Sequence, residues 1–381
     1  MARFLFVSWG GAGNQTPVFG LAAALAARGH DITVAGYPEQ RDRFELLGFE
    51  FLALPRAQHA WPSTPPDDWM PALVDAVWAC PAHLEDIPGL MAGERYDLLV
   101  IDCLMFAALA AAETAGIPAV ALVHSAPGAM APPGGGLDHL ALPQVNAVRA
   151  RAGLTPLPTL WDAWRPFTAL VTSVPDLDPY DGGLPDGFAF VGPVFEPPRK
   201  PQWTSPWATG DHRPLVVASF STGQAWDQTS RIRRTRDALS DGRYRVLITT
   251  GVFTVDPMPG SPDVSLAPYV PHHAVLPEAS VMISHAGHGT VAAALSHGVP
   301  MVCLPNLAAD QPALAHRLAE LGAGIVLDGD AATPSDIAGA VSTVLGDAAY
   351  RDNARRLAEV IKAAPGTEGI ASRLTGLLAV R

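Results

Sequence analysis

The sequence predicts an α/β protein with two doubly wound domains, each a parallel sheet flanked by helices. Three observations predict this class: short apolar runs alternate with Ala/Leu-rich helical stretches, the alternation stops in a proline-rich segment near residue 200, and it then restarts. A length of 381 residues suits two domains, and 49% apolar against 16% charged residues indicates a large buried core.

The first half shows a repeated order of strand and helix, which requires a parallel sheet with right-handed crossovers. Strands are expected at residues 3–9, 32–35, 97–101 and 119–123, and helices at 18–28, 39–47 and 104–115. Pro17 marks the start of the first helix and Gly29 its end. Two stretches rich in Trp and Pro, 55–95 and 126–165, are expected to be long irregular loops.

The second half repeats the pattern after residues 192–214, which contain too many prolines for a helix or a central strand. Strands are expected at residues 215–218, 245–249, 281–283 and 301–304, and helices at 227–239, 289–297, 311–321, 350–363 and 370–380. The predicted division is an N-terminal domain (1–198), a linker (199–214), a C-terminal domain (215–364) and a final helical segment (365–381).

Composition excludes several classes of protein. The 25 basic and 37 acidic residues give a net charge of −12, which argues against a protein that coats nucleic acid or an anionic membrane. The three cysteines, Cys80, Cys103 and Cys303, form no CxxC pair, and no stretch has the pattern of a signal peptide or a membrane span. A reducing cytoplasm is therefore the expected location.

The densest cluster of chemically active residues lies at 270–291. The strand expected at 281–283 runs into Ser284 and His285, and the sequence Ala-Gly-His-Gly-Thr (286–290) then turns into a helix. A helix N-terminus leaves backbone N–H groups free, and its dipole adds positive potential. With His285 as a side-chain donor, this turn predicts a phosphate site. The alternative is an ordinary turn between strand and helix, capped by Thr290.

Other turns also follow predicted strands. Asp310 and Gln311 come after strand 301–304, and a carboxylate beside an amide suits the capture of neighbouring sugar hydroxyls; the alternative is a plain N-cap role for Asp310. Residues 219–223 offer hydroxyl and N–H groups to a diphosphate or a nucleobase. Residues 10–17 match the GxGxxG motif only in part, because Thr16 replaces the third glycine, so a dinucleotide-dependent oxidoreductase is disfavoured.

With these residues, the chain resembles the GT-B glycosyltransferases, the family that glycosylates macrolides, glycopeptides, aromatic polyketides and plant metabolites, and above all its actinobacterial natural-product members. The resemblance covers nearly the whole chain: the first loop and helix through residue 30, Gly192-Pro193, and most specifically residues 271–311. It implies two facing Rossmann-like domains, with the acceptor in the N-terminal half, the nucleotide sugar in the C-terminal half, and the last helix crossing back onto the N-terminal domain. It also implies metal-independent transfer that inverts the anomeric centre, with no cofactor and with dTDP as the expected nucleotide.

The resemblance also implies roles for individual residues. His285 and the N–H groups of Gly287, Gly289 and Thr290 would hold the diphosphate, with His288 in the same turn, and Asp310 and Gln311 would contact the sugar. Ser221 and Thr222 would lie near the phosphates, and Val270 near the base. The expected acceptor-binding residues are Trp61, Trp69, Trp78 and Trp161, whose flat rings suit a flat apolar aglycone but singly also suit packing.

The general base departs from the family pattern. Many relatives carry His or Asp three residues before the proline that starts the first helix, and this chain carries Asn14, whose amide cannot accept a proton at neutral pH. The partner carboxylate maps to Asp102. Three accounts are open: Asp102 acts directly or through Asn14 or a water, another residue such as His124 supplies the base, or the acceptor needs little help. Structural roles, a helix cap for Asp102 and a core position for His124, are the alternatives.

The sequence thus predicts an inverting glycosyltransferase that moves a (deoxy)sugar from a nucleoside diphosphate to a hydrophobic natural-product aglycone. Two alternatives stay open: a non-catalytic homologue that binds nucleotide sugar, and a nucleotide-sugar epimerase of similar build. The expected partners are the nucleotide sugar and a hydrophobic small molecule, with a homodimer left open and with neither nucleic acid nor a membrane span.

Overall fold

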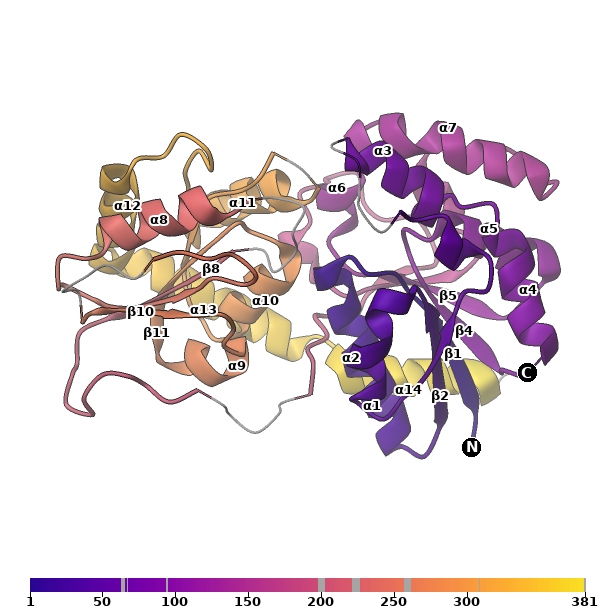
Figure 1. The fold of residues 1–381 in the computed structure, drawn as a ribbon, viewed down its shortest axis with the longest axis horizontal. Helices are drawn as coiled ribbons and strands as arrows, with labels where there is room; N and C mark the ends of the chain where they lie inside the picture. The colour runs from indigo at the N-terminus through magenta and orange to yellow at the C-terminus, as the bar shows by residue number, and fades with distance from the viewer. Residues whose placement is uncertain are drawn as a thin grey trace. The chain divides into compact units, whose positions relative to one another are not determined.

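The fold is described from a computed structural model that gives residues 1–62, 66, 68–93, 95–197, 203–220, 227–256, 262–307 and 309–379. The chain divides into two compact units (Figure 1). The first consists of Met1–Pro175, Tyr180–Pro197 and Pro365–Arg381, and the second of Asp176–Pro179 and Pro198–Ala364. None of the helices in these described ranges has the length and apolar character needed to cross a membrane.

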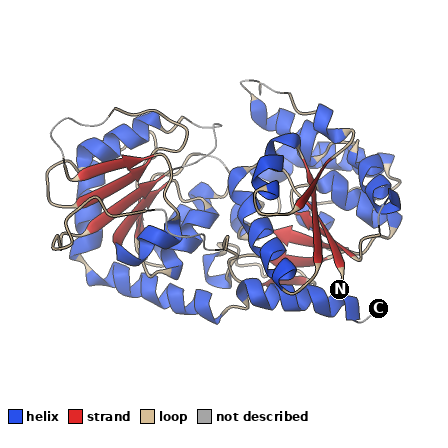
Figure 2. Cartoon of the chain, turned by 60° about the horizontal axis from the view of Figure 1, so that its bottom comes forward, coloured by secondary structure: helices blue, strands red, loops and turns tan. Residues whose placement is uncertain are grey.

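The first unit is built on a seven-stranded sheet of order β3-β2-β1-β4-β5-β6-β7, and all its strand pairs are parallel. Its strands are β1 (Arg3–Val7), β2 (Asp31–Gly36), β3 (Glu50–Ala53), β4 (Leu98–Asp102), β5 (Ala119–Val123), β6 (Thr168–Val171) and β7 (Phe188–Phe190). Side chains alternate between two buried layers: Leu5 and Val7 of β1 join one apolar cluster, and Phe4 and Phe6 join the other. Helices cover both faces (Figure 2), which is why these strands are continuous apolar runs.

The helices of the first unit correct one prediction. They are α1 (Gln15–Ala27), α2 (Arg41–Glu45), α3 (Trp69–Leu73), α4 (His83–Gly93), α5 (Phe106–Ala115), α6 (Pro127–Met130), α7 (Gly136–Arg151) and α14 (Gly366–Ala379). The stretches 55–95 and 126–165, expected to be irregular, contain α3, a π-helical turn (Val74–Trp78), α4, α6 and α7. Pro88 and Pro143 lie inside α4 and α7, so proline content was a poor guide to loops here.

The last helix, α14, packs against α1 within the first unit. Ile370, Ala371 and Leu374 are buried in the same apolar cluster as Phe19 of α1. At the end of α1, the Arg28 guanidinium donates a 2.7 Å hydrogen bond to the carboxylate of Glu368. The end of the chain is therefore part of the core of the N-terminal unit.

A close contact at Gly20 of α1 gives a stability prediction. A Cβ at this position would lie 2.4 Å from the carbonyl oxygen of Phe195 and 2.5 Å from Cγ1 of Val194. We expect Gly20→Ala to lower the free energy of unfolding by about 1–3 kcal/mol, because a backbone carbonyl cannot move aside cheaply. Denaturant unfolding measures the change.

The matched control for this prediction is Gly89→Ala in α4, where an added Cβ meets no atom within 4 Å. Alanine favours a helix over glycine, so this variant should gain about 0.5–1 kcal/mol. Losses of equal size in the two variants would contradict the packing argument.

The second unit is built on a six-stranded parallel sheet of order β10-β9-β8-β11-β12-β13. Its strands are β8 (Leu215–Ser219), β9 (Arg245–Thr249), β10 (Val264–Ala267), β11 (Ala279–Ser284), β12 (Met301–Cys303) and β13 (Gly324–Val326). Its helices are α8 (Thr229–Ala238), α9 (His272–Val275), α10 (His288–Ser296), α11 (Gln311–Glu320), α12 (Pro334–Gly346) and α13 (Ala348–Ala363). Strands β3, β6, β7, β10 and β13 and, in this unit, helices α9 and α12 are additional to those predicted.

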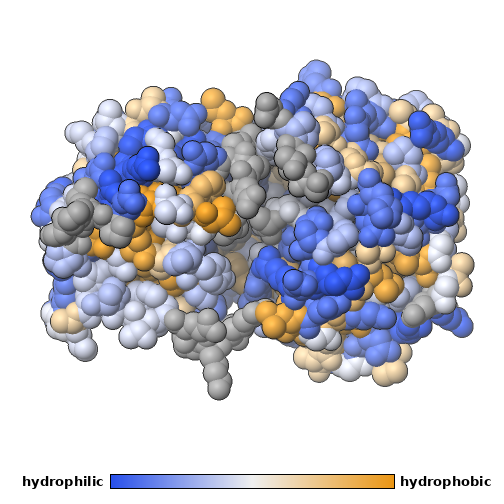
Figure 3. Space-filling view, in the orientation of Figure 1, coloured by the Kyte–Doolittle hydropathy of each residue, from blue (hydrophilic) through white to orange (hydrophobic). Residues whose placement is uncertain are grey.

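Both sheets share one order, which confirms the predicted α/β class. Counted within each unit, the strands run 3-2-1-4-5-6, with a seventh strand after the sixth in the first unit. The order therefore reverses between β1 and β4 in the first unit and between β8 and β11 in the second. Ligands of such sheets bind outside the carboxyl ends of the strands at this reversal. The topology therefore marks one candidate site in each unit. Figure 3 shows hydrophilic and apolar side chains interspersed over the drawn face of each unit.

Candidate active site

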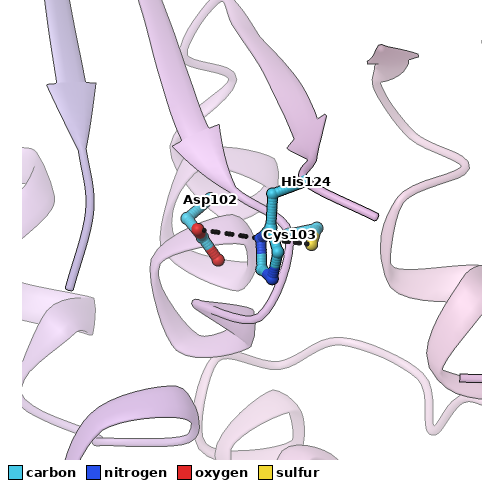
Figure 4. A group of neighbouring side chains, drawn as sticks. All are labelled: Asp102, Cys103 and His124. Carbon is cyan, nitrogen blue, oxygen red and sulfur yellow. Dashed lines mark hydrogen bonds and ion pairs between the residues drawn. The ribbon is translucent and has the colours of Figure 1, made fainter. Parts of the chain in front are cut away.

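In the first unit, a polar cluster lies at the reversal between β1 and β4. Val7 of β1 pairs with Ile101, and Asp102 at the end of β4 pairs with Leu122 of β5. The parallel register therefore brings His124, which follows β5, beside Asp102, although 22 residues separate them in sequence. Nδ1 of His124 lies 3.1 Å from Oδ2 of Asp102 (Figure 4).

Asp102 is surrounded by hydrogen-bond donors. Its Oδ1 accepts from the Trp9 indole N–H at 3.2 Å and from the Leu104 backbone N–H at 3.0 Å. Its Oδ2 accepts from the Asn14 amide at 3.0 Å and faces His124. A carboxylate has about four lone-pair sites, and all four are used here. Burial acts to raise the pKa of Asp102, but His124 and these hydrogen bonds hold it below its usual value.

Cys103 lies beside the pair but does not form a nucleophilic triad. Its Sγ is 3.5 Å from His124 Nδ1, the nitrogen that also faces Asp102, whereas a triad needs the nucleophile and the carboxylate on different ring nitrogens. Cys103 is fully buried, and burial raises the pKa of its thiol. The thiol, carboxylate and imidazole ligand atoms lie within 4.8 Å of one another, but the saturated carboxylate favours a hydrogen-bonded pair over a metal site.

The charge on His124 is set by its neighbours. Burial acts to lower the pKa of His124, but Cys103 and Asp102 together raise it well above 6.5. Since burial keeps the Cys103 thiol protonated near neutral pH, we attribute the rise to the Asp102 carboxylate.

The structure thus brings together the three residues predicted for catalysis, Asn14, Asp102 and His124. Asp102 also binds the N–H of Leu104, as the helix-cap alternative anticipated, so the two roles coexist. Trp9 was not predicted as a site residue, because the sequence placed it inside the first strand, whereas β1 ends at Val7 and leaves the indole beside Asp102.

The four tryptophans predicted to bind acceptor fall into two groups. Trp78 and Trp161 are only 4% and 3% exposed, so their rings are core side chains, and Trp161 packs edge-on against Tyr180. Trp61 and Trp69 are partly buried and pack against the edge of the same cluster. Of the four, only Trp61 and Trp69 are therefore partly exposed.

In the second unit, the turn after β11 lies at the reversal between β8 and β11. Ser284 pairs with Ser219, and the chain then turns through Ala286, whose φ of 63° lies in the left-handed region. The Ser284 hydroxyl accepts the Ala286 N–H at 3.0 Å, and Gly287 is the N-cap residue of α10. A non-glycine residue at positive φ stores strain, and such strain is typical of functional turns.

The free donors of this turn differ slightly from the prediction. Within the described residues, the N–H groups of Gly287 and Gly289 have no hydrogen-bond acceptor. The Thr290 N–H donates to the Gly287 carbonyl at 3.0 Å, which leaves only the Thr290 hydroxyl for a ligand. Two backbone N–H groups at a helix N-terminus form the core of an anion site.

The ring of His285 lies beside Gly287 in this turn. A Cβ at Gly287 would lie 2.6 Å from its Nε2, so any larger residue there would displace the ring. Its Nδ1 is buried without a partner within the described chain. Burial, with the positive charge of Arg231, lowers the pKa of His285 to about 4, although a hydrogen bond with the Ser219 backbone acts in the opposite direction. The ring is therefore neutral at physiological pH and can donate one hydrogen bond.

The loop before α11 contains Asp310 and holds the side chain of Gln311, the first residue of the helix, in a fixed orientation. Gln311 Oε1 accepts from the backbone N–H and the side-chain amide of Asn306, at 3.0 and 2.9 Å. Its Nε2 is then the end that can donate to a ligand. Asp310 occupies the N-cap position of α11 but makes no capping hydrogen bond with its side chain, so the plain N-cap alternative is not supported.

Hydrogen bonds from Arg231 of α8 hold the loop before α11 in place. The guanidinium is 4% exposed and donates to Asn306 Oδ1, to the Gly329 carbonyl at 2.9 Å and to Asp330 Oδ1 at 2.8 Å. Neither Arg231 nor Asn306 stood out in the sequence, because an arginine among four in α8 carries no positional signal.

The remaining predicted donor residues are Val270, His288, Ser221 and Thr222. Val270 and His288 are buried. Ser221 and Thr222 lie outside the described residues. Large apolar side chains are exposed at Val252, Tyr269 and Leu307, after β9, β10 and β12, at the edge where a ligand of this sheet is expected.

Comparisons with known protein families agree with this geometry. Residues 252–377 match the family described as "Erythromycin biosynthesis protein CIII-like, C-terminal domain", and residues 10–155 match "Glycosyl transferase 4-like domain". The chain is 28% identical to 4'-demethylrebeccamycin synthase of Lentzea aerocolonigenes, over 99% of this chain and 100% of that protein. It is also 28% identical to demethyllactenocin mycarosyltransferase of Streptomyces fradiae, over 99% and 87%.

Solved structures show the same architecture. The calicheamicin glycosyltransferase CalG4 is 25% identical with a TM-score of 0.78, over 100% of this chain and 98% of that one. The glycotransferase of kitacinnamycin is 23% identical with a TM-score of 0.80, over 99% of both chains. The glycosyltransferase VinC, solved in complex with dTDP, is 19% identical with a TM-score of 0.71, over 100% of both chains.

Proposed function

Because this chain is a glycosyltransferase of the GT-B fold, similar to enzymes of antibiotic biosynthesis, we propose that it moves a sugar from a dTDP-linked donor to a hydroxyl group of an apolar natural product. The observation that carries the proposal is the turn after β11. It combines the N–H groups of Gly287 and Gly289, which are unbonded within the described residues, the neutral His285 ring and the N-terminus of α10, whose dipole favours an anion.

The turn supplies what the chemistry of the leaving group requires. As the bond between the anomeric carbon and the phosphate oxygen breaks, negative charge gathers on the diphosphate. Fixed donors and a helix dipole stabilise that charge without rearrangement. Because the N–H groups of Gly287 and Gly289 and the dipole of α10 can provide this stabilisation, we propose that transfer needs no metal ion.

Two side chains at the start of α11 have complementary hydrogen-bonding roles toward the sugar. Gln311 donates through Nε2, because its Oε1 is taken by Asn306, and Asp310 accepts. Such a pair suits two neighbouring hydroxyls of a hexose or deoxyhexose.

We also propose that the reaction inverts the anomeric centre. Retention by double displacement requires a carboxylate that attacks the sugar. Asp102, at the centre of the first unit's cluster, has every lone pair occupied and is 1% exposed, so it does not serve as that nucleophile. A single displacement by the acceptor oxygen inverts the configuration.

The proposal is tested with purified protein, a panel of dTDP- and UDP-sugars and a panel of apolar aglycones, with and without EDTA. We expect product with dTDP-sugars, an inverted anomeric linkage by NMR coupling constants, and the same rate within twofold after EDTA treatment. Donor binding without product from any acceptor would favour a non-catalytic homologue, and conversion of the donor alone would favour an epimerase. Restoration of an EDTA-sensitive rate by Mg²⁺ would overturn metal independence.

A further inference from the structure

The base that removes the acceptor's proton can be located from the cluster in the first unit, given the proposed function. Asp102 is not that base, because its four lone-pair sites already accept from Trp9, Leu104, Asn14 and His124. These bonds also hold its pKa below the usual value, so it accepts a proton poorly.

Asn14 is not the base either. Its amide nitrogen donates both to Asp102, at 3.0 Å, and to the Trp9 carbonyl, at 3.1 Å. An amide has no basic lone pair at neutral pH. Asn14 is 3% exposed, and its observed contacts fix the position of the carboxylate.

His124 differs from its neighbours in access and in orientation. Its side chain is 13% exposed, whereas Asp102 and Cys103 are at 1% and 0%. Nδ1 faces Asp102, so the tautomer with Nδ1–H donating to the carboxylate is favoured, and Nε2 then carries the lone pair. Within the described chain, no hydrogen bond involves Nε2.

We infer that His124 is the general base of the transfer and that Asp102, with Asn14 behind it, is a positioning residue. The acceptor O–H gives its proton to Nε2 of His124 as the oxygen attacks the anomeric carbon. The bond from that carbon to the diphosphate breaks, and its electron pair leaves with the nucleoside diphosphate. The base thus lies at the end of β5 instead of in the first loop, where this chain has an amide.

The pH profile of the wild-type protein tests the inference first. A base must be neutral to act, so activity should fall as pH drops through the pKa of His124, which Asp102 raises above 6.5. Among described residues, Asp102 and Cys103 are the titratable groups that act on His124. An acid limb of kcat/KM above pH 6.5 is expected, and constant activity down to pH 5 would overturn the inference.

Two variants separate a catalytic from a structural role. His124→Gln should lower kcat by about 10²–10⁴-fold with the Kd for dTDP unchanged. Asp102→Asn should lower the rate and move the acid limb to lower pH, because the imidazolium loses its carboxylate, and a purely structural effect would not move the limb. His139→Gln, an exposed histidine of α7, is the matched control and should leave both unchanged.

The outcomes separate this inference from the proposed function. A wild-type protein that makes no product with any donor and acceptor contradicts the function. If the wild-type protein makes product and the His124→Gln variant keeps the same rate, the proposed function stands and only the assignment of His124 as the base is overturned. If circular dichroism shows that His124→Gln does not fold, the acid limbs of the pH profiles of the wild type and of Asp102→Asn still decide whether His124 is the base.

Discussion

Replacing His285 with alanine is expected to lower kcat/KM for the sugar donor by about 10²–10³-fold, the usual cost of losing one fixed donor to a developing negative charge. The ring lies against Gly287, and its Nδ1 is buried without a partner in the described chain. Because burial and the nearby Arg231 lower its pKa to about 4, His285 stays neutral above pH 5, and the deficit should be the same at pH 6 and pH 8. Initial rates against donor concentration and calorimetry with dTDP measure it.

The design of this experiment includes a conservative variant and a control. His285→Gln keeps one N–H donor and should recover part of the loss. His316→Ala removes an exposed histidine of α11 in the same unit and should leave donor use unchanged. Acceptor affinity should be retained in all three variants. Unchanged turnover of His285→Ala would show that the turn after β11 does not hold the diphosphate.

Replacing Arg231 with methionine is expected to lower the free energy of unfolding of the second unit by about 1–3 kcal/mol, the cost of leaving buried acceptors without their hydrogen-bond donor. The guanidinium contacts Asn306, the Gly329 carbonyl and the Pro305 carbonyl at 3.4 Å, and these acceptors would lose a charged donor. Its pair with Asp330 adds little, because that carboxylate is exposed. Denaturant unfolding followed by a probe in the second unit measures the change.

Arg231→Met should also weaken donor use. Asn306 orients the Gln311 amide, so a loosened Asn306 leaves that amide free to rotate and should raise KM for the donor. Arg233→Met, at an exposed position of the same helix, is the matched control and should change stability by less than about 0.5 kcal/mol. A similar loss in the two variants would mean that helix propensity, not the buried network, is responsible.

The fold class could be predicted because buried parallel strands are continuous apolar runs. Strand β5 matches its predicted bounds, and β9 does too. Strands such as β13, with three residues, are too short to give a pattern of their own and exist because a neighbouring strand pairs with them. The sequence does not predict helices α4 and α7, because each contains a proline and proline disfavours a helix interior. Tertiary packing outweighs that preference here.

Individual residues of the candidate site could be predicted from the sequence, but the contacts between them could not. His285 and Gly287 could be found because glycine and histidine at the end of a strand are chemically distinctive. The contact between Asp102 and His124 could not, because it depends on β4 and β5 lying side by side in register. Arg231 and Asn306 interact across 75 residues, and no local pattern marks such a pair.

The placement of α14 affects how this enzyme could be recombined with its relatives. A chimera that joins residues 1–197 to a foreign second half would import a foreign terminal helix against α1. Ile370, Ala371 and Leu374 would be exchanged for side chains shaped to another core, and the first unit would be mispacked even with a perfect junction. Hybrid enzymes should therefore inherit residues 365–379 from the same parent as the first 197.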